Sequence, residues 1–150
     1  MKYIKTYENW FSNYFKEPEI EPQTQEELDK QLYDAIVNVT DFFSAADALN
    51  KGANPNQVQD EGRGYEYSLL MIASTNGDMK LIEKLIEHGA DVYFRAYQWE
   101  YDRDVKDYFD FVNNVCFFEY RPKIKKIILK YHPDFMEERE LRKDTKKYNL

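Results

Sequence analysis

The sequence predicts an all-α fold, a solenoid of about three helix–turn–helix units with long loop fingers and helical caps. The first observation is a repeat, since Gly52-Ala53-Asn54 and Gly89-Ala90-Asp91 lie 37 residues apart, each after a helical pattern. A fixed period of this length is typical of stacked repeats. The second is composition, because 25 aromatic residues against five Gly and five Pro in 150 residues indicate a packed chain.

The N-terminal part of the chain predicts a helix and a linker. Residues 1–16 are expected to form an amphipathic helix, because apolar side chains recur at spacings of three and four. These are Ile4, Tyr7, Phe11 and Tyr14. Residues 17–23 hold two prolines and three glutamates and predict an extended acidic linker. Two roles remain open for the helix: it packs on the first repeat, or it binds a partner.

The first repeat is expected over residues 24–56. Thr24 and Glu27 have the spacing of a capping box, which begins a helix. Asp41 offers the cap of a second helix, and Gly52 suits the left-handed residue that ends it.

The second repeat, 57–92, shows the same signals more clearly. Ser68 and Asp78 are expected to cap its two helices, with a break at Gly77 and a stop at Gly89.

The third repeat, expected over 93–135, shows the repeat pattern only weakly. Pro122 suits the first turn of its second helix, and His132-Pro133 replaces the Gly-Ala stop. Residues 136–150 are highly charged and predict a frayed capping helix with a disordered end, in which Glu138 and Arg142 have the spacing of an ion pair.

These units resemble ankyrin repeats, most closely over residues 68–92. Ser68 takes the place of the usual Thr, and Gly89-Ala90-Asp91-Val92 matches directly. Met71 stands where the family has a His that bonds the neighbouring loop. Residues 32–56 match more weakly, with one extra residue between the helices, and residues 105–135 match only in periodicity. The resemblance implies protein binding through loop fingers and the concave face of the first helices. The start of the chain, Met1-Lys-Tyr-Ile-Lys-Thr-Tyr-Glu8, also resembles small phage proteins.

Two loops, 54–67 and 93–107, are longer than a minimal repeat needs, and they hold the candidate partner-binding residues. Aromatic residues alternate along both loops, which places them on one face of an extended finger, and Tyr, Trp and Arg are enriched at interface hot spots. The candidates are Tyr65, Tyr67, Tyr97, Trp99, Tyr101, Asp102 and Arg103. The alternative is that these aromatic rings cover exposed helix ends of the same chain.

The net charge of −7 is unevenly distributed. Residues 1–92 carry 8 basic and 17 acidic side chains, or −9, whereas residues 93–150 carry 13 and 11, or +2. Such acidity disfavours nucleic acid and anionic lipid as partners. The basic segment 121–130 predicts a solvated helix face, with a phosphate-binding helix as the less favoured interpretation.

Other chemistry finds little support in the sequence. His88, His132 and Cys116 would be the nearest to a metal cluster, but their spacing lacks a ligand pattern, and we expect no metal or cofactor. Cys116 is expected to be a buried small hydrophobic residue, and Gly62-Arg63-Gly64 is expected to form the tip of the first loop finger. With no catalytic motif, no leader and no long apolar run, we expect a cytoplasmic protein that is not an enzyme.

Three hypotheses follow. The first is a protein-binding module that uses the aromatic fingers and the concave face. The second is an acidic viral or phage inhibitor that covers a basic, nucleic-acid-binding surface of a host protein. The third is an unrecognised enzyme. Salt dependence of binding separates the first two, because screening weakens contacts between exposed charges.

Overall fold

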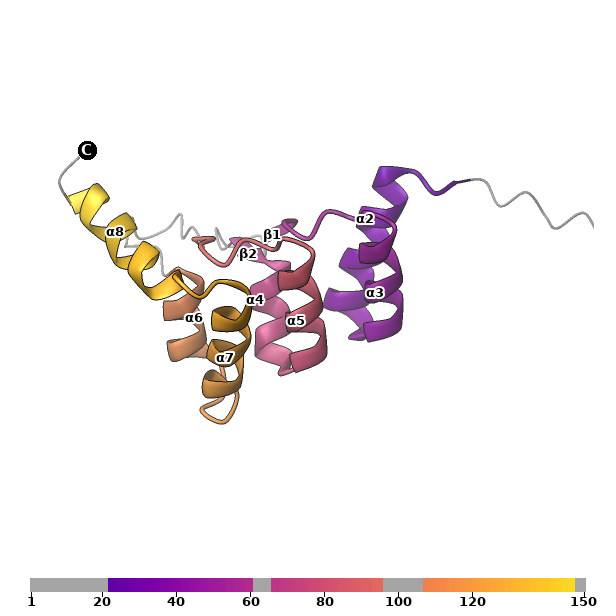
Figure 1. The fold of residues 1–150 in the computed structure, drawn as a ribbon. Coiled ribbons are helices and arrows are strands. Elements are labelled where there is room, and N and C mark those ends of the chain that lie inside the picture. Colours follow the sequence, from indigo (N-terminus) through magenta and orange to yellow (C-terminus); the bar gives the residue numbers. More distant parts are fainter. Residues whose placement is uncertain (1–21, 61–65, 96–106, 148–150) are drawn as a thin grey trace, which may run out of the picture.

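The computed structural model describes residues 22–60, 66–95 and 107–147, which are mostly helical (Figure 1). The expected helix over 1–16 and most of the linker over 17–23 lie outside these ranges. The elements are, in chain order, α2 (Gln25–Asp34), the π-helical turn η1 (Ala35–Val39), α3 (Phe42–Asn50), β1 (Val58–Asp60), β2 (Glu66–Ser68), α4 (Leu69–Asn76), α5 (Met79–Glu87), α6 (Tyr108–Val115), α7 (Arg121–Tyr131) and α8 (Phe135–Lys147).

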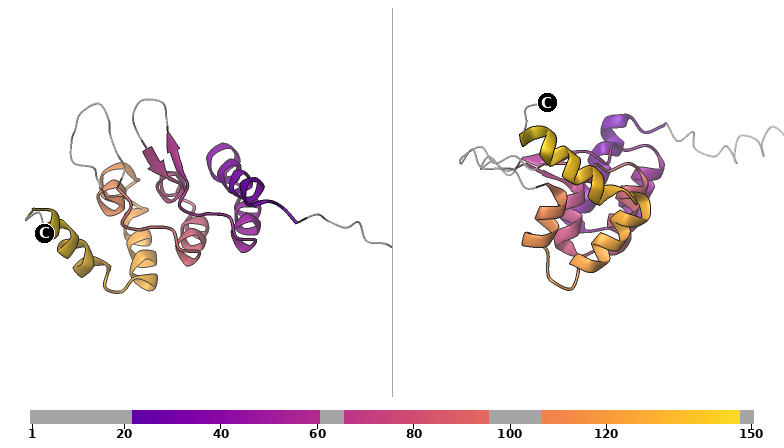
Figure 2. Two further views of the ribbon diagram at one scale, coloured as in Figure 1. Left: turned by 90° about the horizontal axis from the view of Figure 1, so that it is seen from above. Right: turned by 60° about the vertical axis from the view of Figure 1, so that its left-hand side comes forward.

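The helices are arranged in two rows (Figure 2, left). One row contains α2 with η1, then α4, then α6, and the other contains α3, α5 and α7. Each helix of the first row packs on the next helix of the chain, so that α2–α3, α4–α5 and α6–α7 form three antiparallel pairs. The last helix, α8, lies at the α6–α7 end of the rows.

The predicted helix starts are confirmed. Thr24 and Glu27 form the complete capping box, and hydrogen bonds from Thr24 hold the pKa of Glu27 below its usual range. Asp41, Ser68 and Asp78 each accept hydrogen bonds from amides in the first turns of α3, α4 and α5. These side chains satisfy amides that a helix start leaves without partners.

The join between α2 and α3 differs from the join between α4 and α5. Here α2 continues as the π-helical turn η1, and the Asp41 amide donates to the Ala35 carbonyl at 2.8 Å. Thr40 then adopts a left-handed conformation, with a φ of 54°. A π-helical turn accommodates one more residue than an α-helical turn, so η1 takes up the extra residue.

The loops after α3 and α5 are built alike. Gly52 and Gly89 have φ values of 103° and 89°, the region in which glycine is favoured. Their amides donate to carbonyls three residues earlier, Leu49 and Ile86, at 3.0 Å in both cases. The alanine amides that follow bond five residues back, at 2.9 Å in both cases. The same helix stop therefore occurs twice, 37 residues apart.

The links between neighbouring loops are also repeated. The Asn56 side chain donates to the Gly89 carbonyl at 3.1 Å and accepts from the Asp91 amide at 2.7 Å. One unit earlier, Gln25 donates to the Gly52 carbonyl at 3.0 Å, and Asp29 accepts from the Asn54 amide at 2.7 Å. Met71 is buried in the core, and the side chain of Asn56 provides the link between these loops.

The first long loop, expected over 54–67, contains a short β-hairpin. Strands β1 and β2 pair antiparallel, with Gln59 opposite Tyr67. The second long loop is closed at its base by a bridge between Arg95 and Asp107. The fold is therefore mostly helical, with a small two-stranded sheet.

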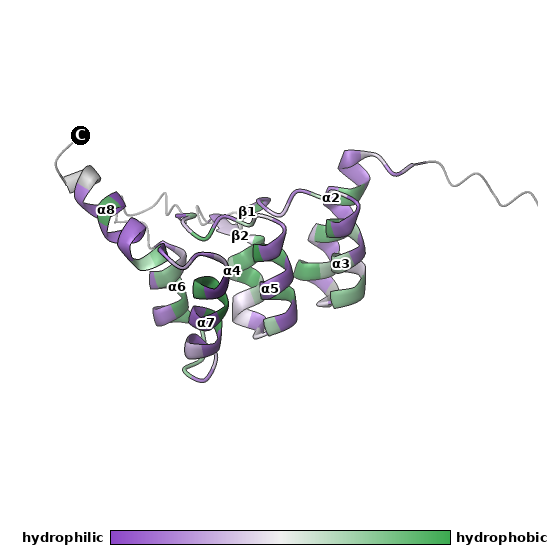
Figure 3. Ribbon diagram, viewed as in Figure 1, coloured by the Kyte–Doolittle hydropathy of each residue, from purple (hydrophilic) through white to green (hydrophobic). Residues whose placement is uncertain are grey.

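The core lies between the two rows and continues through all three helix pairs. Figure 3 shows hydrophobic colour where neighbouring helices face one another. Fully buried side chains include Leu32, Leu49, Leu70, Leu85, Tyr108, Ile124 and Ile128. The Tyr108 hydroxyl and the Ser74 hydroxyl, 2.7 Å apart, form a buried hydrogen bond, and burial raises the pKa of Tyr108. This bond joins the second helix pair to the third.

The outer face of the first helix pair is polar. The Gln31 amide donates to the Ser44 carbonyl at 3.2 Å and to the Asp47 carboxylate at 3.3 Å. Lys51 pairs with Asp47 at 2.8 Å. These contacts join α2 to α3 on the side away from the core, so this end of the rows presents polar groups to water.

The C-terminal helix differs from the expectation of a frayed cap. It begins at Phe135, whose ring is buried and stacks on Tyr93, with centroids 5.1 Å apart. The predicted ion pair between Glu138 and Arg142 is wrong. Glu138 instead accepts a short hydrogen bond from the Tyr93 hydroxyl, and the Arg142 guanidinium lies 4.0 Å from the Tyr93 ring centroid. Tertiary contact with Tyr93 replaces the local pairing.

Candidate binding groove

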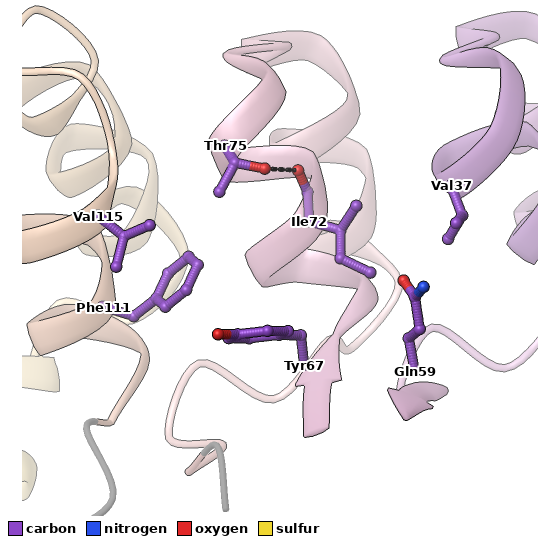
Figure 4. Close-up of a pocket in the computed structure, with 7 residues that line it drawn as sticks. All are labelled: Val37, Gln59, Tyr67, Ile72, Thr75, Phe111 and Val115. Carbon is purple, nitrogen blue, oxygen red and sulfur yellow. Dashed lines mark hydrogen bonds between the residues drawn. The ribbon is translucent and has the colours of Figure 1, made fainter. Parts of the chain in front are cut away.

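A groove of about 460 Å³ crosses the first row of helices at the base of the hairpin (Figure 4). It is lined by seven residues: Val37, Gln59, Tyr67, Ile72, Thr75, Phe111 and Val115. They come from η1, β1, β2, α4 and α6, so all three helix pairs contribute. The groove therefore forms only when the three helix pairs stack, because no single pair contains all of its lining residues.

The position of each lining residue follows from its element. Gln59 and Tyr67 are directly opposite in the hairpin, which puts both side chains on the same face of the two strands. Ile72 and Thr75 are one helical turn apart and point into the groove from α4 (Figure 4). Phe111 closes the side formed by α6, and its ring contacts Tyr67 with centroids 5.6 Å apart.

Most of the described side chains that line the groove are apolar, and none of the seven carries a charged group. Its side chains are aliphatic or aromatic apart from Gln59, Thr75 and the Tyr67 hydroxyl. The Thr75 hydroxyl donates to the Ile72 carbonyl at 2.7 Å, so its proton is already used within α4. Such a lining offers van der Waals contact and a few hydrogen bonds, and it contains no carboxylate, histidine or thiol that would move a proton or attack a substrate.

Of the predicted partner-binding residues, the structure places Tyr67 in this groove. Its ring is half-buried and touches Phe111, so it packs on the chain itself while lining the open surface. The other six, Tyr65, Tyr97, Trp99, Tyr101, Asp102 and Arg103, lie outside the described residues, as does Gly62-Arg63-Gly64.

Sequence reasoning missed the helical half of the groove. Ile72 and Phe111 were not among the predicted partner-binding residues, because apolar residues at helical spacing normally face the core. The sequence did contain one signal: the helix α4 is apolar over a wider surface than the single stripe that a helix needs to face the core. In α4, five buried residues already fill the core face, and Ile72 is apolar beyond them.

His88, His132 and Cys116 do not lie together in the structure. His88 and His132 follow the ends of α5 and α7, whereas Cys116 follows α6 at the opposite end of the helix pair. Within the described ranges, no three His, Cys, Asp or Glu side chains come together as metal ligands would. Burial raises the pKa of the Cys116 thiol to about 11, which keeps it protonated and makes it a poor nucleophile.

The basic helix α7 turns its isoleucines inward, with Ile124 and Ile128 buried. At its C-terminal end Lys130 pairs with Glu83 of α5 at 2.5 Å, and this hydrogen bond lowers the pKa of Glu83. The lysines of α7 are exposed and do not line the groove, and Lys125 lies over the Phe109 ring of α6, with Nζ 5.9 Å from the ring centroid.

No protein-family model, curated protein or solved structure matches this chain. Among the helices of the described part, none has the length and apolar character that crossing a membrane requires.

Proposed function

We propose that the chain is an ankyrin-like solenoid and a non-enzymatic protein-interaction module, which binds its partner in the groove and along the adjoining loop fingers. The repeated helix stops at Gly52 and Gly89 support the repeat architecture. So do the repeated loop links made by Gln25 and Asp29 in one unit and by Asn56 in the next. Stacked repeats of this kind form extended concave binding surfaces.

One observation carries the functional proposal: three successive helix pairs and the hairpin together form an open, apolar and uncharged groove. The centre of a protein interface is depleted of charged residues and enriched in aromatic ones, as here with Tyr67 and Phe111. An acidic mimic of nucleic acid would need carboxylates at its contact surface, and the seven lining residues include none. The groove therefore favours apolar recognition over charge mimicry.

The experiment compares a groove residue with an exposed apolar residue outside both the groove and the loops. Val115 lines the groove and is 53% exposed, whereas Phe43 is 82% exposed on α3 and does not line it. Each is changed to Lys in the full chain, and partner recovery from an extract of the native host cells is quantified. A lysine buried by the partner would lack a countercharge in the groove, so V115K should lower recovery at least about tenfold while F43K leaves it near wild type.

Equal recovery with both variants would remove the groove from the proposal. A salt titration of the recovered complex addresses the acidic inhibitor directly. Binding through the apolar groove should vary little between low and physiological salt, whereas contact between the acidic units and a basic surface should weaken steeply.

A further inference from the structure

The turn between α6 and α7 presents an unusual amount of apolar surface. Val115, Phe117 and Phe118 are 53%, 67% and 84% exposed. The turn is the lowest part of the ribbon in Figure 1, and it projects beyond the neighbouring helix pairs. Residues 115–118 are here called the tip, and their exposed side chains, Val115, Phe117 and Phe118, form an apolar surface at this turn, while Cys116 between them is buried.

Several contacts hold the tip in place. The Tyr120 ring packs so closely on the α4–α5 turn that a Cβ at Gly77 would lie 2.3 Å from it. Phe117 contacts Tyr120 edge-on, with ring centroids 5.7 Å apart. Arg121 donates to the Cys116 carbonyl at 3.0 Å, and its guanidinium lies 5.7 Å from the Phe118 ring centroid. The exposed rings are thus presented by an anchored turn.

The tip is followed by a strongly basic helix. Residues 116–131 contain five cationic side chains and one carboxylate, Glu119, for a local charge of +4. Lys130 is paired with Glu83 at the far end of α7. Lys123 and Lys126 lie within about two turns of the tip, are exposed and form no ion pair with any described residue.

We propose that the tip and the neighbouring lysines of α7 form a docking site for an anionic lipid surface. Phenylalanines at a convex turn enter the boundary between headgroups and acyl chains without a complementary pocket, and flanking lysines remain at the anionic headgroups. A protein partner fits less well, because lysine is depleted in protein interfaces and a projecting tip needs a matching cavity.

The acidity of the rest of the chain does not prevent this docking. The first helix pair lies two helix spacings from the third, about 16–20 Å, which exceeds the screening length of about 8 Å at physiological salt. Within the described residues, Glu119 directly follows the tip, Asp110 precedes it on α6, and Asp78 follows Gly77, whose turn lies against Tyr120. The sequence-based expectation of no membrane contact rested on the acidic net charge of the chain, and the basic segment 121–130 was expected to be only a solvated helix face.

The test is flotation of the full-length protein with vesicles of phosphatidylcholine alone or mixed equally with phosphatidylglycerol. Two phenylalanines of nearly equal exposure provide a matched pair: Phe118 at the tip and Phe43, 82% exposed, in the acidic first pair. Wild type and F43S should bind the mixed vesicles alike. F118S should bind them about tenfold more weakly, since it loses the apolar contact of one ring.

A charge variant completes the test. K123E/K126E should abolish the preference for phosphatidylglycerol, and raised salt should reduce it in the wild type. All the substituted side chains are exposed, so unchanged circular dichroism is expected throughout. Failure of the wild type to float with the mixed vesicles would overturn the proposal, as would equal binding by F118S and F43S. The vesicles contain no protein, so either result is independent of the groove and its partner.

Discussion

Arg139 is expected to be the most important single side chain for holding α8 on the third helix pair. Its side chain is 7% exposed, and Nε donates to the Asp107 carboxylate at 2.8 Å. Nη2 donates to Asp110 at 2.6 Å, and the guanidinium lies 4.9 Å from the Phe109 ring centroid. Burial alone lowers the pKa of Arg139, but the bonds and charges of the two carboxylates raise it overall. It is therefore a charged side chain packed into the interior.

Changing Arg139 to Met keeps most of the side-chain volume and removes the charge. Asp107, 9% exposed, then loses its countercharge while it still caps α6 through the Asp110 amide at 2.9 Å. Removing one partner of a buried ion pair costs about 3–5 kcal/mol of the free energy of unfolding. We expect R139M to lie near the lower limit, because Asp107 keeps the hydrogen bond that it accepts from the Asp110 amide and the Asp110 carboxylate is partly solvated. Equilibrium urea unfolding, followed by circular dichroism, measures the loss.

Two further variants separate the buried charge from other effects. K143M, on the same helix, removes an exposed pair with Glu140 at 3.6 Å and should change the free energy of unfolding by less than about 1 kcal/mol. Adding Asp107→Asn to R139M retains a capping side chain and removes the orphaned charge, so the double variant should be more stable than R139M alone. A loss below about 1 kcal/mol for R139M would refute the reasoning.

Three other predictions concern the core and the turns. Gly77→Ala should destabilise the protein by about 3 kcal/mol, because a φ of 72° costs backbone strain of about 1–2 kcal/mol and the new Cβ would in addition lie 2.3 Å from a tyrosine ring. Gly52→Ala, which meets no atom within 4 Å, should cost only the backbone strain of about 1–2 kcal/mol, and equal losses in urea unfolding would contradict this contrast. Tyr108→Phe removes the buried hydrogen bond to Ser74 and should cost about 1 kcal/mol by the same assay, with a neutral result contradicting its role. The pKa of Cys116 rises from 9.0 to about 11 on folding, so the unfolded state loses its proton first and stability should fall between pH 9 and 11. Cys116→Ala should flatten that part of the pH profile, and an unchanged slope would contradict it.

The helices were predictable because their signals are local. Thr24, Asp41, Ser68 and Asp78 each cap a helix through amides two or three residues away, and these short-range contacts do not depend on the rest of the fold. The left-handed glycine stops were predictable for the same reason, since few other residues adopt that conformation.

Features that depend on residues far apart were predicted less well. The ion pair expected between Glu138 and Arg142 satisfied the local rule, but both side chains turn to Tyr93, more than forty residues earlier. The groove was found only through Tyr67. The other lining residues belong to helices, and their exposure depends on which helices stack beside them. The hydrophobic periodicity of one helix does not contain that information. The π-helical turn η1 was visible only as one surplus residue.

The polar contacts across α2 and α3 have a consequence for how the molecule associates. Asp47 and Lys51, each with a half-exposed side chain, would have to leave water if another helix pair, or a second copy, stacked against that face. The effective desolvation cost of several kcal/mol per ion opposes such a contact. At the other extremity α8 covers the third pair. Within the described residues, the polar contacts on this face therefore oppose head-to-tail stacking of one molecule on the next.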